Sequence, residues 1–519
     1  MSKKINKNLY RAILIITFII LNGFIIFGLS SVLGYLNTGA DRSSILHLPV
    51  ESHMVYLPKT VWTSIDNPGR EMEKQTLAEL QKDYLNSWYI KNLAYKDNHK
   101  YGITDFYTDS AQINIYKTID YNKSHNIHIE STTLSHNLNL EFYSTDGQLA
   151  VFTDRNVEEY QQLYKNKKIA FENTQINDYK VMMLLEDGFW RIRHMVKSLP
   201  EKKIKDTLQK NPFAKVVKDK IKIDGKTFTI KGINYYPQKN PWDMFGNHFD
   251  TAVIESDFKI ISNANLNTIR IFIQYDDFGK AQVKDDKLKK LEQVLNLAKK
   301  YNIKVIVTLF DFYGNYDIQD WTLTHRHAEK IVSTFKNHPS ILAWDIKNEP
   351  DLDFKSRGEL TVKRWLEYMI KEIKKFDPNH LVTIGWYSTI AAENLTNQVD
   401  FVSFHYYLKN FEEDYIQLKT NVPNKPLLLG EFGVSSYKGL WHPFGQSLEK
   451  QAEYHKTMQA IFKKENIAYL SWTLYDFENI PTSVVGSLPW RKNKQKHFGF
   501  MDKNGDKKPS FSFLSGSGQ

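Results

Sequence analysis

The chain is 519 residues long, with 41% hydrophobic and 14% aromatic residues, no cysteine and a formal net charge of +10. This length is enough for more than one domain, and the absence of cysteine excludes a disulfide framework and a lipoprotein acylation site. Four of the positive charges lie in the first eleven residues, and the other lysines are spread along the chain. A nucleic-acid-binding protein concentrates its basic residues in a patch, so we expect no nucleic-acid partner.

The first predicted element is a transmembrane signal anchor over residues 12–36. These 25 residues contain no charged side chain, and as a helix they could cross a hydrocarbon core about 30 Å thick. The basic residues within 1–11 are expected to keep that tail cytoplasmic, so that the rest of the chain is exported. A cleavable signal peptide is the alternative, but residues 30–34 match an Ala-x-Ala cleavage site poorly. We therefore predict a single-pass protein of the plasma (inner) membrane, with the lipid bilayer as a partner and a periplasmic or extracellular catalytic domain.

Residues 37–60 are predicted to form a linker, and residues 61–200 a small α+β domain. Residues 70–92 have a helical pattern, and several strand signals follow them. The turns Asp146-Gly147 and Asp187-Gly188 each join two strand signals, which predicts two β-hairpins in an antiparallel sheet. The predicted strands are 126–133, 138–143, 148–152, 179–185 and 189–196.

The order of these elements, a long helix and then an antiparallel sheet, resembles the nuclear-transport-factor-2-like cone at the level of the fold alone. Cones of this kind bind ligands or mediate association, and a fold does not by itself decide between such functions. Three interpretations of residues 61–200 therefore stay open: a glycan-binding module, a partner-docking module, and a spacer that holds the next domain away from the membrane.

Residues 201–218 are predicted to be a second linker, residues 219–514 a large α/β domain and residues 515–519 a flexible tail. In the large domain, short apolar runs alternate with amphipathic helical stretches, which is typical of βαβ units. About 280 residues accommodate eight such units, so we predict a (β/α)8 barrel. The turn Asp224-Gly225 predicts a hairpin ahead of the first barrel strand. Predicted strands include 233–236, 304–310, 341–345, 381–385 and 401–404, and predicted helices include 287–300, 360–376 and 447–464.

Two of the apolar runs end in a glutamate. Residues 343–350 read AWDIKNEP and residues 427–433 read LLLGEFG, which places Glu349 and Glu431 at the ends of buried strands. The carboxyl ends of barrel strands form the face that carries the active site. Glycosidic bond cleavage needs one protonated carboxyl to donate to the leaving oxygen and one carboxylate to meet the sugar carbon. The pair therefore predicts a glycosidase, which would retain configuration if the carboxyl groups lie about 5 Å apart.

With these motifs, the chain from about Ile221 to Asp502 resembles the retaining (β/α)8 glycoside hydrolases of the clan that contains family 5 and the barrels of family 2. The resemblance implies that Glu349, in Asn-Glu-Pro after strand four, is the acid/base. It implies that Glu431, at the end of strand seven, is the nucleophile. An activity like that of endo-glucanases and mannanases is implied as well.

The resemblance also implies roles for residues at the ends of other strands. Arg270 would keep the nucleophile ionised, since a nearby cation lowers the pKa of a carboxylate. Asn348 would hydrogen-bond the sugar 2-hydroxyl, and His405 would line the same subsite. Tyr407 would hydrogen-bond the nucleophile, and Trp472 would offer an aromatic platform to the sugar ring.

Aromatic residues also follow several predicted strands, among them Tyr236 after strand one and Trp386 after strand five. We expect both to contact substrate, because sugar rings stack on aromatic side chains, although packing beneath the loops is the alternative. The segment His325-Arg326-His327 is not expected to bind a metal, since two histidines at i and i+2 do not converge on a helix. The predicted chemistry needs neither a metal nor a cofactor.

Together these features predict a membrane-anchored, extracytoplasmic retaining β-glycosidase that acts on a β-linked polysaccharide or oligosaccharide. Processing of an exported polysaccharide, beside a membrane glycosyltransferase partner, would fit this location. A transglycosylase with the same residues is one alternative, because a sugar hydroxyl could replace water as the acceptor. A noncatalytic glycan-binding or scaffold subunit of a polysaccharide-synthesis complex is another, although unpaired charges in its cleft would be costly to hold.

Overall fold

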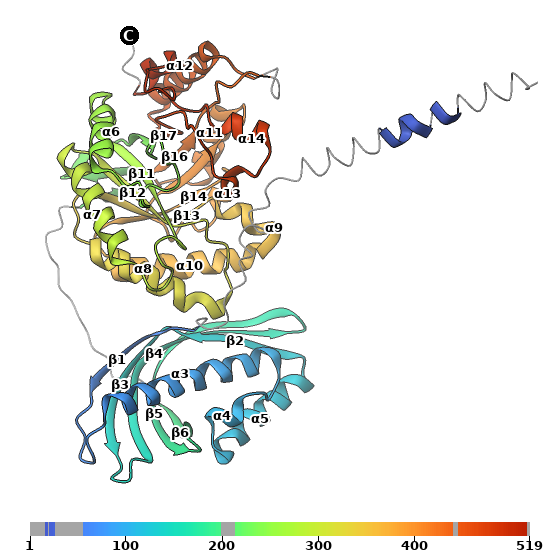
Figure 1. The fold of residues 1–519 in the computed structure, drawn as a ribbon, viewed down its shortest axis with the longest axis vertical. Coiled ribbons are helices and arrows are strands. Elements are labelled where there is room, and N and C mark those ends of the chain that lie inside the picture. The colour runs from blue at the N-terminus through green and yellow to red at the C-terminus, as the bar shows by residue number, and fades with distance from the viewer. Residues whose placement is uncertain (1–15, 19, 26–55, 199–212, 440–444, 516–519) are drawn as a thin grey trace, which may run out of the picture.

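The computed structural model describes residues 16–18, 20–25, 56–198, 213–439 and 445–515. The described residues from 56 onward form two folded domains (Figure 1). We call residues 56–198 the sheet domain and residues 213–515 the barrel domain. Most of the predicted anchor, both predicted linkers and the predicted tail lies outside the described residues. Within the described parts of the chain, no helix combines the length and hydrophobicity that crossing a membrane requires.

The sheet domain is a six-stranded, mostly antiparallel sheet with helices packed on one face (Figure 1). Both predicted hairpins are confirmed, because the β3–β4 and β5–β6 turns contain Asp146-Gly147 and Asp187-Gly188. Apolar side chains of the long helix, including Leu80 and Trp88, pack on sheet residues such as Phe152 and form a core separate from that of the barrel. The elements are β1 (Lys59–Ser64), α3 (Lys74–Asp97), α4 (Ile103–Phe106), α5 (Asp109–Ser124), β2 (Ile127–Thr133), β3 (Ser135–Tyr143), β4 (Leu149–Lys165), β5 (Lys168–Glu186) and β6 (Phe189–Ser198).

The barrel domain confirms the predicted (β/α)8 architecture. Its parallel strands follow one another in sequence order, and the last pairs with the first to close the barrel. The strands are β10 (Lys231–Asn234), β11 (Thr268–Gln274), β12 (Lys304–Asp311), β13 (Ile341–Asn348), β14 (Leu381–Trp386), β15 (Val402–Tyr406), β16 (Leu427–Phe432) and β17 (Ala468–Ser471).

Helices surround these strands, and most of their bounds lie within a few residues of the prediction. Amphipathic sequence explains their formation: in the helix at 359–376, for example, Trp365, Leu366 and Met369 are buried while Lys363 and Lys371 lie toward the solvent. The longer helices are α6 (Thr251–Asn263), α7 (Asp285–Lys300), α8 (Trp321–Phe335), α10 (Glu359–Phe376), α11 (Phe411–Asn421) and α12 (Leu448–Glu465). The shorter ones are η1 (Ile318–Asp320), η2 (Pro350–Asp353), α9 (Phe354–Arg357), η3 (Ala391–Glu393), α13 (Thr482–Val485), α14 (Pro489–Gln495) and η4 (Pro509–Phe513).

The amino-terminal end of the barrel is closed by the predicted hairpin. Strands β8 (Lys220–Ile223) and β9 (Lys226–Thr227) pair across Asp224-Gly225, and β7 (Lys215–Val217) adds a third strand. Ile221 and Ile230 pack with Leu428 and Leu470 in a buried cluster at this end. The opposite end of the barrel is therefore the one left open for a site.

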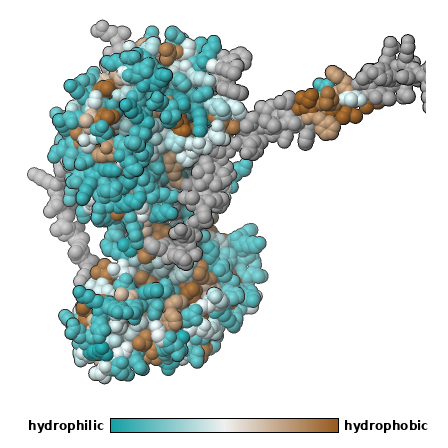
Figure 2. All heavy atoms as spheres, viewed as in Figure 1, coloured by the Kyte–Doolittle hydropathy of each residue, from teal (hydrophilic) through white to brown (hydrophobic). Residues whose placement is uncertain are grey.

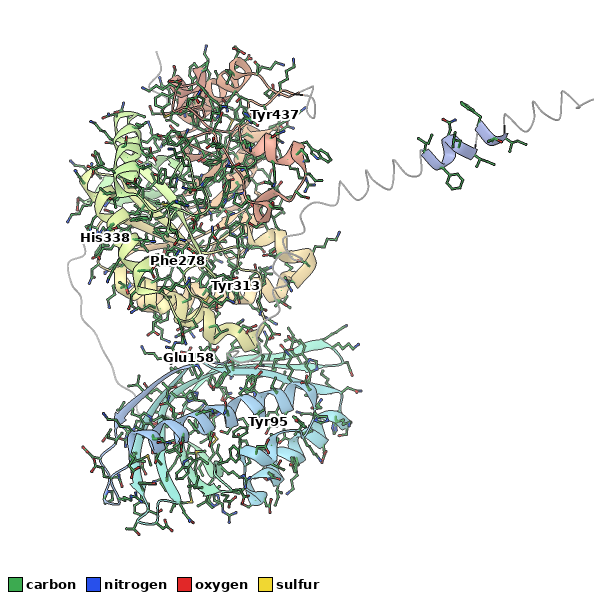
Figure 3. All side chains as sticks on the ribbon, viewed as in Figure 1. Tyr95, Glu158, Phe278, Tyr313, His338 and Tyr437 are labelled. Atoms are coloured by element: carbon green, nitrogen blue, oxygen red, sulfur yellow. The ribbon has the colours of Figure 1, made fainter. Side chains whose placement is uncertain are left out.

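The two domains are joined by a packed and charged junction. The Glu158 carboxylate of the sheet domain, 7% exposed, accepts hydrogen bonds of 2.8 Å from both Lys371 and Lys375 of α10. The ring of Tyr160 lies 4.5 Å from that of Trp321, centroid to centroid, and joins the barrel's hydrophobic core. Figure 3 shows Glu158 at this boundary. The sheet domain is thus packed directly onto the barrel.

Candidate active site

Glu349 and Glu431 both lie at the carboxyl end of the barrel. Glu349 directly follows β13, and its backbone has a φ of +50°, in the left-handed region that non-glycine residues rarely adopt. Its N–H donates to the carbonyl of Gly385 at 2.7 Å, which holds this conformation. Glu431 is the fifth residue of β16. Both side chains are largely buried, at 10% and 12% exposure.

The two carboxyl groups face each other across the barrel mouth. One oxygen of Glu349, one oxygen of Glu431 and a ring nitrogen of His405 lie within 4.8 Å of one another. Retaining glycosidases keep their two carboxyl groups about 5–5.5 Å apart, whereas inverting ones need about 6.5–9.5 Å to admit a water molecule. The observed separation has the retaining geometry.

Polar groups surround the Glu431 carboxylate. The Tyr407 hydroxyl donates to its Oε1 at 2.6 Å, and Arg270 Nη1 lies 3.6 Å from its Oε2. Burial raises the pKa of Glu431, and the charge of Glu349 raises it further; His405, Arg270 and the Tyr407 hydroxyl lower it. The Tyr407 bond therefore stabilises the ionised form of this side chain against its burial.

The position of Arg270 differs from the prediction in one respect. It lies within β11 rather than at its end, and its side chain points into the barrel, where it is almost fully buried. Its nearest carboxylate is Asp345 of β13, whose Oδ2 accepts from Nη2 at 2.6 Å and from Nε at 2.9 Å. It also donates to Asn348 Oδ1 at 3.0 Å. Arg270 therefore joins the strands beneath the site and reaches Glu431 only at longer range.

Asp345 is a positioning residue that the sequence analysis missed. Besides Arg270, its carboxylate accepts from the Thr308 hydroxyl at 2.7 Å and from the N–H of Gly385 at 2.8 Å. A Cβ at residue 385 would lie only 2.7 Å from Arg270 Nη2, so a glycine is needed there. A charged residue inside the apolar run 341–346 was the available signal for Asp345.

Asn348 and His405 lie directly beside the two glutamates. The Asn348 side-chain carbonyl oxygen accepts from Arg270, which leaves its amide nitrogen available as a donor. His405 is fully buried, and its Nδ1 is hydrogen-bonded to Glu349 Oε1 at 3.0 Å. The structure thus brings Arg270, Asn348, His405 and Tyr407 to the two glutamates, while the substrate contacts expected of Asn348 and His405 stay predictions.

The predicted aromatic contacts are less direct. Trp472 is 5% exposed and packs edge-on against Tyr236, with ring centroids 6.2 Å apart. Trp386 is buried against Phe354. None of Tyr236, Trp386 and Trp472 lines the described pocket over the glutamates, so their contacts with substrate stay predictions.

The pocket above the glutamates has a volume of 630 Å³. Its walls come from the loops after β13, β14, β15 and β17, and two of its side chains, Arg491 and Lys494 of α14, are basic. Neither forms an ion pair within the described part of the chain. These walls belong to loops whose arrangement the sequence analysis did not predict. The lining residues are Glu349, Leu352, Tyr387, Tyr407, Glu431, Val484, Val485, Arg491, Lys494, Gln495 and Phe498.

Glu349, His405 and Glu431 are close enough to hold a metal ion by geometry alone. The guanidinium of Arg270, 3.6 Å from Glu431, opposes a cation at this position. In the His325-Arg326-His327 segment of α8, His325 bonds the Tyr368 hydroxyl at 2.7 Å and His327 bonds the Lys280 carbonyl at 2.8 Å. Both histidines therefore have structural roles.

The Tyr407 contact leads to a first test. We expect Tyr407→Phe to lower kcat/KM about 10²-fold, since a preorganised donor at a reacting centre commonly has an effect of this size. Because the lost bond lowers the Glu431 pKa, the acid limb of the pH profile should move to higher pH. Tyr387→Phe is the matched control, because Tyr387 lines the same pocket and, among the described contacts, its hydroxyl makes no hydrogen bond to Glu431. An unchanged acid limb in Tyr407→Phe would contradict this role.

Comparison with known proteins agrees with this site. Residues 221–478 match the family "Cellulase (glycosyl hydrolase family 5)". Human β-glucuronidase is 26% identical over 303 residues, which cover 52% of this chain and 42% of that protein. A putative mannan endo-1,4-β-mannosidase 4 of Arabidopsis thaliana is 28% identical over 178 residues, covering 26% of this chain and 43% of that protein. The chain spans about two fifths of the length of the curated relatives it matches.

Solved structures give likenesses of low identity. A β-D-glucuronidase from Dictyoglomus thermophilum has a TM-score of 0.43 and 18% identity, covering 74% of this chain and 67% of that one. The exo-β-1,4-mannosidase Op5Man5 from Opitutaceae bacterium strain TAV5 has a TM-score of 0.47 and 16% identity, covering 60% and 61%. Neither the family match nor the two curated relatives named above supports a nuclear-transport-factor-2-like identity for the sheet domain, which stays a prediction.

A closed parallel barrel with two facing glutamates at its carboxyl end defines a retaining glycoside hydrolase. The barrel domain belongs to the clan of (β/α)8 glycoside hydrolases that contains family 5 and the family 2 β-glucuronidases.

Proposed function

We propose that this glycoside hydrolase cleaves β-glycosidic bonds by double displacement, with Glu431 as the nucleophile and Glu349 as the acid/base. The observation that supports this proposal most strongly is the short separation of the two carboxyl groups. The asymmetry of their surroundings supports the assignment of roles. Glu431 is contacted by a hydroxyl donor and lies near a guanidinium, and both lower its pKa against the effect of burial, while Glu349 is hydrogen-bonded to His405.

In the first step, Glu431 attacks the anomeric carbon while Glu349 donates its proton to the departing oxygen. The Glu431 carboxylate becomes an ester, and its bond to the Tyr407 hydroxyl orients it for attack. In the second step, Glu349 removes a proton from water, and the water attacks the same carbon and releases Glu431. Asn348, held by Arg270, would present its amide to the sugar 2-hydroxyl in both steps.

We further propose that the sugar in the pocket carries a carboxylate, as a uronic acid does. Arg491 and Lys494 line the pocket and have no acidic partner within the described residues, so an anionic substrate would complement them. The names of the β-glucuronidase relatives support this choice. The mannosidase names among the relatives make a neutral mannoside the competing substrate.

Aryl β-glycosides distinguish these two substrates. We expect kcat/KM for 4-nitrophenyl β-D-glucuronide to exceed that for the β-D-mannoside and β-D-glucoside at least tenfold. Arg491→Gln with Lys494→Gln should remove that preference, since a charge-assisted hydrogen bond contributes about 1.5–3 kcal/mol. Lys492→Gln is the matched control, because Lys492 is in the same helix but is not part of the pocket lining. A preference for the mannoside that the double variant leaves unchanged would overturn the uronate assignment.

We also propose that the enzyme is anchored in the membrane through residues 12–36 and works outside the cytoplasm, on an exported polysaccharide. The uncharged stretch behind a basic tail supports this location. Within it, residues 16–18 and 20–25 are helical and expose apolar side chains such as Phe18 and Phe24 (Figure 2). Full-length protein should remain in the membrane fraction after an alkaline carbonate wash, whereas a chain that starts at residue 52 should not; recovery of both in the soluble fraction would contradict the anchor.

A further inference from the structure

A second cleft, of 770 Å³, lies where the sheet domain meets the barrel. We call it the interdomain cleft. On the sheet-domain side its wall includes Tyr164 of β4 and the adjacent residues Lys167 and Lys168 at the β4–β5 turn. On the barrel side its wall includes Arg357 of α9 and Arg364 of α10. Neither domain alone would form this cleft.

The walls of the interdomain cleft are held in place by bonds that cross the domain boundary. Arg364, 13% exposed, forms an ion pair of 2.7 Å with Glu172 of β5. Lys371 and Lys375, which form the ion pairs with Glu158, lie on the same helix as Arg364. A cleft fixed in this way is preformed, so a ligand would not have to order its walls on binding.

The charge of the interdomain cleft favours an anionic ligand. Its acidic lining residues Glu130 and Asp317 both lie near Lys96, at 4.0 and 3.3 Å, which neutralises part of their charge. Lys167 and Lys168 are exposed and form no ion pair within the described residues. An excess of positive charge remains, and it is concentrated on the β4–β5 turn.

The interdomain cleft also has an aromatic wall. The Tyr164 ring stacks on His128, with centroids 4.5 Å apart and an interplanar angle of 8°, which fixes its orientation. An aromatic ring beside polar and cationic side chains is suited to a sugar that carries a carboxylate, because the ring packs on C–H groups while the cations pair with the acid.

One short segment of chain separates the interdomain cleft from the active-site pocket. The loop after β13 runs from Glu349 through η2 into α9, so that Leu352 lines the pocket and Ser356 lines the cleft. Four residues of helical chain span only roughly 6–8 Å. Figure 1 shows α9, α13 and α14 on the right-hand side of the barrel domain, with strands of the sheet domain extending below α9.

We propose that the interdomain cleft is a distal subsite that binds a further stretch of the acidic glycan chain whose other part lies in the active-site pocket. This inference rests on the proposed function. The sheet domain would then be part of the substrate-binding surface rather than a spacer. The enzyme would prefer long chains over short ones.

Chain length is the variable that tests this subsite. To measure binding, we would titrate β-linked oligoglucuronates of one, two, four and eight units into the full chain carrying Glu431→Ala. To measure turnover, we would assay the same series and 4-nitrophenyl β-D-glucuronide with the chain in which Glu431 is intact. In each background, Lys167→Gln with Lys168→Gln should weaken binding or kcat/KM roughly three- to tenfold for the long chains. It should leave the one-unit ligand and the aryl glucuronide unchanged.

Lys289→Gln with Lys299→Gln is the matched control, because it removes the same charge from α7, on the opposite side of the molecule in Figure 1. Equal affinity for all lengths, equal losses at every length, or equal losses in the control would overturn the subsite. Binding of anionic phospholipid vesicles that the Lys167 and Lys168 changes abolish, without any effect on oligosaccharides, would assign these lysines to a membrane surface instead. Failure of the proposed function is recognised separately, by the absence of turnover of every glycoside by the unaltered chain.

Discussion

Glu431→Ala is expected to lower kcat about 10⁴-fold or more on any glycoside that the enzyme cleaves, because the first step then has no nucleophile. The barrel should fold normally. Burial already disfavours the Glu431 charge, so removing it relieves a desolvation cost, and the melting temperature should fall little or even rise.

Rescue by a small nucleophile is a more specific test of Glu431→Ala, because such a molecule can occupy the space that the Glu431 side chain leaves. A small external nucleophile such as azide should attack the anomeric carbon from that side and give the α-glycosyl azide at a measurable rate. Glu478→Ala is the matched control, since Glu478 is an exposed glutamate on the loop after β17. Retention of more than about one tenth of the activity in Glu431→Ala would exclude this residue as the nucleophile.

Glu349→Ala should have an effect that depends on the leaving group. A sugar or alkyl alcohol needs the proton that Glu349 donates, so its release should slow about 10³-fold or more. A dinitrophenolate leaves without a proton, so the first step should be almost unaffected with that substrate, and the glycosyl-enzyme should accumulate because water is no longer activated. The melting temperature is a necessary control here, because Glu349 also binds His405 Nδ1.

Azide again distinguishes the role of Glu349, because it reacts without a general base. It should restore turnover of the dinitrophenyl substrate and give the β-glycosyl azide, the opposite anomer to that formed by Glu431→Ala. A loss of activity that is the same for good and poor leaving groups would show that Glu349 is not the acid.

Transglycosylation uses the same two glutamates, so neither substitution separates it from hydrolysis. The two reactions differ only in the acceptor that attacks the glycosyl-enzyme, which is water in hydrolysis and a sugar hydroxyl in transglycosylation. An acceptor sugar would have to enter the same pocket as water, and Tyr387 and residues of α14 line that pocket. The ratio of longer to shorter products from one oligosaccharide decides between the two reactions.

Much of the barrel could be predicted because most of its strands are short apolar runs and most of the segments between them are amphipathic helices. The long β4–β5 hairpin of the sheet domain could not, because residues 153–178 carry polar side chains on both faces and show no alternation. Contacts across the domain boundary, such as those of Glu158 and Tyr160, explain why these residues still form strands.

The two glutamates could be predicted from local sequence, since each ends an apolar run. The residues that hold the site together could not be predicted, because their contacts join different strands. Asp345 of β13, for example, is hydrogen-bonded to Arg270 of β11. The sequence also did not show which of the neighbouring residues Trp386 and Tyr387 faces the pocket. They are neighbours at the end of β14, so their side chains point in opposite directions, and the structure places Tyr387 in the pocket and Trp386 in the core.

The stereochemistry of the first-formed product tests the central claim most directly. Proton NMR spectra recorded during the first minutes of hydrolysis of an aryl β-glucuronide, or of whichever aryl β-glycoside the enzyme prefers, show which anomer is released before mutarotation. Two displacements at one carbon, by Glu431 and then by water, predict that the β-anomer forms first. Release of the α-anomer would mean a single displacement and would contradict the double-displacement account built on the short Glu349–Glu431 separation.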